Sequence, residues 1–164
     1  MSKLLFVAIW CAVLSAGGGF RPAAAADGLL LIDVGMVRTN ELGEVSNWEA
    51  VSSYTLRNLT TRRLYEFRYF LSAVRVNADE VEEGEYCIES IYAYMSNTVL
   101  YFCDEPYFRV VANRVNNGGR WRFAVTDGPS SRKLIFGPKD FDTIMAEAKK
   151  FNKDALRKYG MNVD

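Results

Sequence analysis

Histidine is absent from this chain of 164 residues. The absence removes the usual general base near pH 7, the Ser-His and Cys-His nucleophile pairs, and the commonest zinc ligand. The sequence also contains no G-x-S-x-G motif, no phosphate-binding P-loop and no dinucleotide-binding fingerprint. An enzyme built from this chain would depend on carboxylates, lysine or tyrosine. We therefore expect a protein that is not an enzyme and that needs no cofactor.

Carboxylates are the main remaining source of chemistry. Glu66 and Glu89 both lie in expected strands, but nothing in the sequence brings them to the separation that a glycosidase pair requires. The acidic block Asp79–Glu85 offers oxygen ligands for calcium, yet it lacks the alternating acidic spacing of a calcium loop. We interpret this block as a solvated turn and assign no metal site.

A transmembrane stretch and an excess of one charge are also lacking. The apolar stretch Leu4–Ala16 follows Lys3 and precedes the small residues Ala24, Ala25 and Ala26, and it is too short to cross a membrane. This order is typical of a secretory signal peptide cleaved near Ala26, which predicts a periplasmic or secreted protein of a bacterial envelope.

Removal of residues 1–26 would leave 18 basic and 20 acidic residues, a net charge of −2. A nearly neutral surface gives no electrostatic reason to expect nucleic acid as a partner.

Cysteine is scarce as well. Of three cysteines, Cys11 lies in the predicted signal peptide, which leaves Cys87 and Cys103 as an even pair. In an oxidising compartment the simplest arrangement of these two residues is one disulfide bond. The alternative is two unpaired thiols. Zinc binding is disfavoured because two thiolates without histidine make a poor zinc site.

Most of residues 27–137 have the patterns of strands and turns. Gly28–Val37 is apolar around Asp33, which indicates a strand covered on both faces or an N-terminal strand entering a sandwich. Asn116–Gly119 is expected to form a hairpin turn. The further expected strands are Trp48–Leu56, Arg63–Val76, Tyr86–Tyr94, Thr98–Cys103, Tyr107–Val115, Arg120–Val125 and Lys133–Phe136. The pattern predicts an all-β domain, a β-sandwich of about seven strands, with a closed barrel as the alternative.

Residues 138–164 change to helical spacing. Asp140 is the expected N-cap and Gly160 the expected stop. The apolar positions of this C-terminal amphipathic α-helix are Phe141, Ile144, Met145, Ala148, Phe151, Ala155, Leu156 and Tyr159. This stripe is expected to pack on the sandwich as core. The alternatives are a helix that docks on another protein and a helix that lies on a membrane surface.

Aromatic and basic side chains supply the candidate binding surface. Aromatic residues cluster around Cys103, and their polar tips favour interfaces and carbohydrate-like sites, although they would also serve to pack the core. Arginines on neighbouring strands are expected to share the solvent face of a hairpin, where they form either a solvated polar face, the favoured interpretation, or a site for an anionic group. The candidate residues are Tyr92, Tyr94, Tyr101, Phe102, Tyr107, Arg109, Arg120 and Arg122, with Arg114 beside them.

Two short segments carry a family resemblance. Glu83–Ile88, between a long aromatic strand and Phe108–Val110, resembles the G-x-Y strand of transthyretin-like sandwiches, including carboxypeptidase regulatory-like domains and related proteins of the bacterial envelope. The turn at Asn58–Thr61 before Leu64–Phe67 resembles their first hairpin. The resemblance spans residues 48–125 and implies a binding or structural module whose Tyr86 packs inward. It transfers no catalytic residue.

These observations predict an exported, non-enzymatic module that contacts another protein of the envelope. The aromatic cluster or the tail helix would be the contact surface, and an inhibitor or immunity-type protein would be one form of such a module. A small-ligand or glycan-binding module that uses the tyrosines is the alternative, and a hydrolase working through carboxylates is the third hypothesis.

Overall fold

The computed structural model describes residues 26–40, 44–49, 51–69, 76–94, 98–126, 132–136 and 141–163. The signal-peptide prediction, the cleavage site and the N-cap at Asp140 lie almost entirely outside these residues. The described chain forms two five-stranded sheets and two short C-terminal helices. The prediction of an all-β fold with a C-terminal helix is confirmed, and the described residues hold ten strands where about seven were expected.

The first sheet, sheet A, has the order β10-β9-β1-β2, and β5 pairs with the other half of β1. Its central strands β1 and β9 are parallel, whereas its other pairs are antiparallel. The strands are β1 (Asp27–Thr39), β2 (Val45–Glu49), β5 (Asn77–Glu82), β9 (Val115–Thr126) and β10 (Arg132–Phe136).

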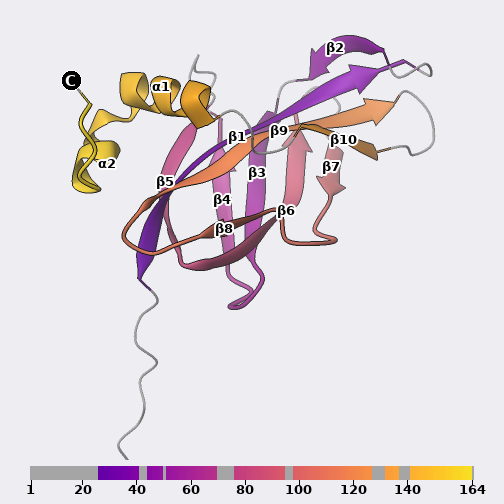
Figure 1. The fold of residues 1–164 in the computed structure, drawn as a ribbon. Helices are drawn as coiled ribbons and strands as arrows, with labels where there is room; N and C mark the ends of the chain where they lie inside the picture. The colour runs from indigo at the N-terminus through magenta and orange to yellow at the C-terminus, as the bar shows by residue number, and fades with distance from the viewer. Residues whose placement is uncertain are drawn as a thin grey trace, which may run out of the picture.

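The second sheet, sheet B, has the order β4-β3-β6-β7, and β8 pairs with the other half of β6. All of its pairs are antiparallel. The strands are β3 (Val51–Asn58), β4 (Leu64–Arg68), β6 (Gly84–Ala93), β7 (Thr98–Tyr101) and β8 (Phe108–Val110). The long strands β1 and β9 of sheet A cross in front of β3, β4 and β6 of sheet B, as Figure 1 shows.

The main core lies between the sheets. Leu30, Ile32, Val34 and Met36 face it from alternate positions of β1. This alternation follows from the two-residue period of a strand. The large buried side chains that they meet come from both sheets and are Tyr54, Leu56, Phe67, Tyr86, Ile88, Ile91, Trp121 and Phe123. The expected inward position of Tyr86 is thus present, and its ring stacks on Phe108 with the centroids 5.8 Å apart.

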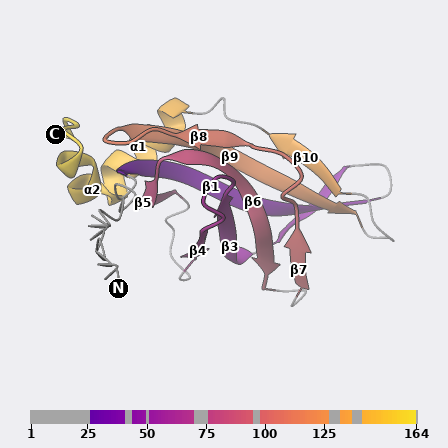
Figure 2. The ribbon, with the colours of Figure 1, turned by 90° about the horizontal axis from the view of Figure 1, so that it is seen from below.

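The C-terminal segment covers the outer face of sheet A. It forms α1 (Phe141–Phe151) and α2 (Lys153–Lys158) rather than one continuous helix. Figures 1 and 2 show both helices at the end of the molecule away from β7 and β10. Tail and sheet share a second apolar cluster of Leu29, Leu31, Val76, Ile144, Ala148, Leu156 and Val163. Strand β1 is therefore covered on both faces, as its apolar run indicates.

In each sheet, two short strands pair with the same edge of one long strand: β5 and β2 with β1, and β8 and β7 with β6. A gap in the hydrogen-bonded ladder remains between the two short strands. In β1 the gap falls between Ile32, paired with β5, and Met36, paired with β2. The Tyr69 hydroxyl donates to the Val34 carbonyl oxygen and accepts from the Val34 N–H, each at 3.0 Å. One side chain thereby replaces the missing ladder bonds, which would otherwise leave backbone groups without partners.

The expected hairpin at Asn116–Gly119 is wrong. These residues lie inside β9, and Gly118 is the extra residue of a bulge opposite Leu31 and Ile32. A Cβ at Gly118 would lie 2.9 Å from Ile32 Cβ and 3.1 Å from the Leu31 carbonyl oxygen, so glycine is required here by the close approach of β1. The chain instead turns before Val115, where Asn113 has a φ of 56°. The Asn116 amide holds that turn through Val111 and Arg114.

The expected solvated turn at Asp79–Glu85 is also wrong. Residues 77–82 form the edge strand β5, because Val81 is buried in the core while Asp79 and Glu80 remain exposed. Of the expected strand Arg63–Val76, the described residues form β4, which ends at Arg68, and residues 70–75 lie outside the described part of the chain. The expected strand Tyr107–Val115 is represented by the shorter strand β8 and the start of β9. The turn between β3 and β4 is as expected, and Asn58 Oδ1 accepts there from the Thr60 and Thr61 N–H groups.

Candidate functional site

The outer face of sheet A is a second core rather than a surface. Ile144, Ala148 and Leu156 from the helices are fully buried against Leu29 and Leu31. Of the expected apolar stripe, Met145, Ala155 and Tyr159 also pack against this cluster. Phe141 and Phe151 stay partly exposed. The central residues of the tail therefore pack on the sandwich as expected, whereas Phe141 and Phe151 do not.

A buried ion network ties the tail to sheet A. Asp33 Oδ2 accepts hydrogen bonds from Arg120 Nε at 2.7 Å and Arg122 Nη2 at 2.6 Å. Arg120 Nη2 also reaches Glu147 Oε2 on α1 at 3.3 Å. The Arg122 side chain lies over Gly35, where a Cβ would come within 3.1 Å of it. Arg120 is thus held by Asp33 and by Glu147 of α1, and Arg122 is held by Asp33.

This network overturns the expected placement of the two arginines. The alternation of β9 does direct Arg120 and Arg122 away from Trp121 and Phe123, but that side of the strand is not a solvent face. Arg122 is 6% exposed and Asp33 is 1% exposed. Arg122 is therefore closed to an external anion, and Arg120, whose side chain is 24% exposed, is already paired with Asp33 and Glu147.

The outer face of sheet B has a different character, because no described element covers it. Tyr92 lies on this face opposite Val99, and Ser90 lies opposite Tyr101, since directly paired residues of antiparallel strands point to the same side. Val99 is 45% exposed, Tyr101 63% and Tyr94, which follows β6, 69%. We call the surface formed by Tyr92, Tyr94, Val99 and Tyr101 the tyrosine face.

Small polar residues and ion pairs surround the tyrosine face. Ser53 pairs with Tyr92, and Thr55 pairs with Ser90, so their side chains lie between the aromatic residues and β4. Towards the edge, Glu66 binds Arg68 through two hydrogen bonds. Glu89 binds Arg57 on the neighbouring strand. Because these charges occur as pairs, the surface around the tyrosines is close to neutral.

The remaining candidate residues do not join the tyrosine face. Phe102 is 7% exposed and contacts Phe123 with a centroid distance of 4.2 Å. Tyr107 donates to the Phe102 carbonyl oxygen and packs beside Trp121. Phe102 and Tyr107 therefore pack in the core, which is the alternative role that the sequence leaves open for the aromatic cluster. Arg109 is exposed on β8 opposite Glu85, and Arg114 is exposed in the turn before β9.

Cys87 and Cys103 form the predicted disulfide bond, with a Cα–Cα distance of 5.2 Å. The bond lies beside the gap in the edge of β6, between the residues paired with β8 and those paired with β7. It is consistent with an oxidising compartment. Among the described residues, Cys87, Glu89 and Cys103 form a group with the spacing of metal ligands. Both sulfur atoms are in the disulfide and Glu89 binds Arg57, so we assign no metal to this group.

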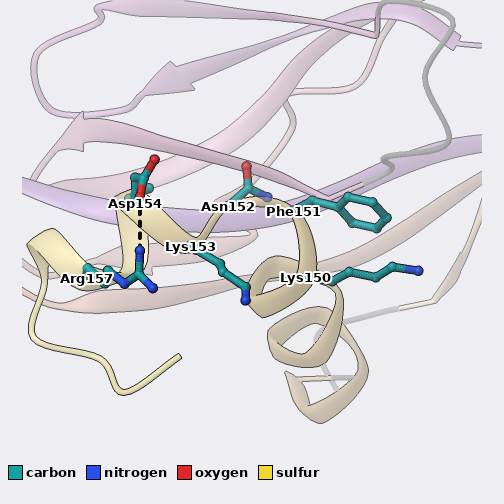
Figure 3. Close-up of a pocket in the computed structure, with 7 residues that line it drawn as sticks. Lys150, Phe151, Asn152, Lys153, Asp154 and Arg157 are labelled. Carbon is teal, nitrogen blue, oxygen red and sulfur yellow. Dashed lines mark hydrogen bonds and ion pairs between the residues drawn. The ribbon is translucent and has the colours of Figure 1, made fainter. Parts of the chain in front are cut away.

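An open pocket of about 480 Å³ lies at the bend between α1 and α2. The basic residues that line it do not point toward a common centre, because the Lys150 and Lys153 side chains extend in different directions (Figure 3). Lys150 Nζ lies 5.0 Å from the centre of the Phe151 ring, and Arg157 pairs with Asp154 at 3.4 Å. Lysines near a helix C-terminus stabilise the helix, which accounts for Lys149 and Lys150 without a ligand.

The sequence patterns do not predict that Asp33, Tyr69 and Glu147 belong to buried polar networks. Asp33 is the one residue whose position indicates such a network, because a carboxylate inside a strand that is covered on both faces needs charged partners. Its partners come from residues 120–147, which the local pattern around Asp33 does not reveal.

Across the described residues, no helix is long and apolar enough to cross a membrane.

No model of a known protein family matches the chain, and no curated protein is significantly similar to it. One solved structure with a detectable likeness is a leucine-rich repeat protein from Bacteroides thetaiotaomicron, with 14% sequence identity and a TM-score of 0.41. The alignment covers 65% of this chain and 15% of that one. The chain thus spans a small part of that protein, and a likeness this weak shows neither a shared fold nor a shared function.

Proposed function

We propose that this protein is an exported, non-enzymatic binding module that contacts another protein of the cell envelope through the tyrosine face. The observation that carries the proposal is the contrast between the two outer faces: the tail covers one as core, and exposed aromatic side chains occupy the other. Tyrosine is enriched at protein interfaces because it combines a large apolar ring with a polar tip.

Two further observations support export. The first 26 residues have the order of a cleaved secretory signal peptide, and the Cys87–Cys103 disulfide is of the kind found in oxidising compartments. The proposal therefore places the mature chain, from Asp27 onward, in the periplasm or outside the cell. The absence of histidine supports a role without catalysis.

The tail is the less suitable contact surface. Its apolar stripe is largely used to bury Leu29 and Leu31, so a partner would have to displace the second core to reach it. A helix that docks on another protein would leave that stripe exposed. We therefore assign the contact to sheet B and a structural role to α1 and α2.

A specific observation also favours a glycan as the second candidate. Hydroxyl side chains of Ser53, Thr55 and Ser90 lie next to Tyr92 and Tyr101, and the nearby charges are paired. Aromatic rings beside polar groups, on a surface without net charge, suit a neutral sugar. Titration with peptidoglycan fragments, followed by tyrosine and tryptophan fluorescence, tests this candidate.

Affinity capture from an envelope extract tests the main proposal. The bait is the mature chain from Asp27 to Asp164, compared with a Tyr94→Ser/Tyr101→Ser variant. The matched control is Phe141→Ser/Phe151→Ser, which removes two partly exposed aromatic residues from the tail. We expect one stoichiometric protein with the wild type and the control and none with the tyrosine variant. A protein captured equally well by the tyrosine variant would rule out this face as the contact surface.

A further inference from the structure

The solvent side of the tail is basic, although the chain as a whole has 20 basic and 20 acidic residues. Residues 149–158 contain five basic residues and one acidic residue. They span the end of α1, the bend and α2. The apolar positions of the tail pack into the second core, so these charged positions lie on the side that faces solvent. The positive charge of the chain is therefore concentrated on one short surface segment.

Ion pairs neutralise only part of this segment. Asp154 pairs with Arg157 in α2, and Glu80 of β5 pairs with Lys158. Glu147, the preceding acidic residue of α1, is engaged by the ion network of sheet A. The basic residues of the segment that pair with no carboxylate among the described residues are Lys149, Lys150 and Lys153. All three are exposed, so their charges are available to an external anion.

Helix stability explains only some of these positions. Cations are favourable at the C-terminus of α1, where Lys149 and Lys150 lie. Lys153 is the first residue of α2, where a helix dipole disfavours a cation. Phe151 lies between these lysines in sequence and is 43% exposed, with Lys150 Nζ 5.0 Å from its ring centre. Unpaired lysines beside an exposed aromatic ring suit a partner that is both anionic and partly apolar.

We propose that the basic surface formed by Lys149, Lys150, Phe151 and Lys153 binds a bilayer that contains anionic lipids. The Lys150 and Lys153 side chains extend in different directions (Figure 3), so they do not converge on one compact anion such as free phosphate. A layer of lipid headgroups is extended, and each lysine can contact it separately. The Phe151 ring can enter the boundary between headgroups and acyl chains, which a soluble acidic protein would not offer.

The position of the tail leaves the tyrosine face free when this surface is occupied. Figures 1 and 2 show α1 and α2 at the end of the molecule away from β7, the strand that carries Val99 and Tyr101. The buried side of the tail stabilises the fold, and only its solvent side contacts the bilayer. The proposal does not rest on the proposed function, because the two surfaces share no residue.

Co-sedimentation with vesicles tests the proposal. The mature chain is mixed with vesicles of phosphatidylcholine, with and without phosphatidylglycerol, at low ionic strength. We expect binding only to the vesicles that contain phosphatidylglycerol, and we expect added sodium chloride to weaken it, because salt screens exposed charges. Equal binding to both kinds of vesicle, or binding to neither, would overturn the proposal.

A matched pair of variants locates the surface. Each lysine near an anionic bilayer changes affinity by about fivefold, so Lys150→Gln/Lys153→Gln should weaken vesicle binding by about 25-fold. The control Arg62→Gln/Arg109→Gln removes the same charge from exposed positions outside the tail and should bind nearly as the wild type does. An equal loss in both variants would assign the binding to net charge alone and would overturn the proposal.

Two further arms separate a bilayer from other anions. Phe151→Ser should also weaken vesicle binding, whereas unchanged binding would indicate a purely electrostatic surface, as for an acidic protein, and would contradict the proposal. Inorganic phosphate should compete no better than sodium chloride of equal ionic strength. Stronger competition by phosphate would indicate a compact anion site instead. The vesicles contain no protein, so these results and capture of the envelope partner can fail separately.

Discussion

The outer faces of the two sheets use similar residue types for different purposes. On sheet A, Asp33, Arg120 and Arg122 form a partly to fully buried network that Arg120 connects to Glu147 of α1. On sheet B, Glu66 and Arg68 form an exposed pair beside the tyrosine face. The difference comes from a segment distant in sequence, because α1 and α2 cover only the first of these faces. The chemistry of a strand face is therefore decided by what covers it.

The largest difference in stability between variants of the two faces should come from replacing a carboxylate on each face. Asp33→Asn removes the charge that faces Arg122 while keeping the size of the side chain. Leaving a buried cation without its partner is expected to lower the free energy of unfolding by about 3–5 kcal/mol. The matched control, Glu66→Gln, breaks an exposed pair and should have no measurable effect. Urea unfolding of both variants checks the prediction, and equal effects would contradict the difference in burial.

A pair of leucines provides the second contrast. Leu156 on α2 is fully buried against sheet A, and Leu64 on β4 is 56% exposed. We expect Leu156→Ala to lower the free energy of unfolding by about 2–5 kcal/mol, because it opens a cavity beneath the tail. Leu64→Ala should change stability little. A small effect of Leu156→Ala in the same urea assay would mean that the tail is not part of the core.

The disulfide is expected to stabilise the uncovered sheet. It closes a sequence separation of 16 residues next to the gap in β6. The double variant Cys87→Ser/Cys103→Ser should lower the free energy of unfolding by about 3 kcal/mol, as chain-entropy arguments predict for a loop of this size. Non-reducing peptide mass spectrometry verifies the bond in the wild type, and unfolding of the double variant measures its effect. An unchanged unfolding midpoint would show that sheet B does not depend on this link.

The free energy of unfolding should fall at alkaline pH because of two tyrosines in the core between the sheets. Burial raises the pKa of Tyr54 well above its ordinary value, and burial together with the Asp33 charge raises the pKa of Tyr69. Since the folded-state pKa values exceed the unfolded value of about 10, the neutral tyrosines stabilise the fold below that pH, and this stabilisation is lost as pH rises above it. Tyrosinate absorbance and circular dichroism should therefore change together above this pH.

The variant Tyr69→Phe tests the source of the alkaline effect. At neutral pH it should cost about 1–3 kcal/mol, because the Val34 N–H and carbonyl lose their partner in the gap of β1. Its stability should also fall less steeply above pH 10 than that of the wild type. The same slope in both proteins would assign the alkaline transition to other groups.

Much of the fold follows from local patterns. The alternation of Tyr65 and Phe67 with Glu66 and Arg68 predicts β4 and its two faces, and the even pair of cysteines outside residues 1–26 predicts the disulfide. The helical spacing of residues 141–159 likewise predicts the tail, whose end before Gly160 agrees with the φ of 72° at that glycine. These signals are local, so the sequence carries them without knowledge of distant contacts.

The predictions that fail depend on contacts between distant residues. Asn116–Gly119 has turn residues, but Gly118 is glycine because β1 passes close to it. Arg122 has the alternation of a solvent-facing residue, but it is buried and paired with Asp33. Asp79–Glu85 has the composition of a turn, but pairing with β1 and the burial of Val81 hold residues 77–82 in a strand. Of the candidate surface, the sequence predicts Tyr92, Tyr94 and Tyr101 but does not separate them from Phe102 and Tyr107, which pack inward.

We assign stability to the outer face of sheet A and recognition to the outer face of sheet B. Tyr101→Ser and Leu156→Ala, each measured both for unfolding free energy and for capture of the envelope partner, decide whether this assignment holds. We expect Tyr101→Ser to abolish capture and to leave stability nearly unchanged. We expect Leu156→Ala to lower stability but still to capture the partner at a temperature where the variant is folded. Capture that survives Tyr101→Ser and is lost in folded Leu156→Ala would reverse the assignment of the two faces.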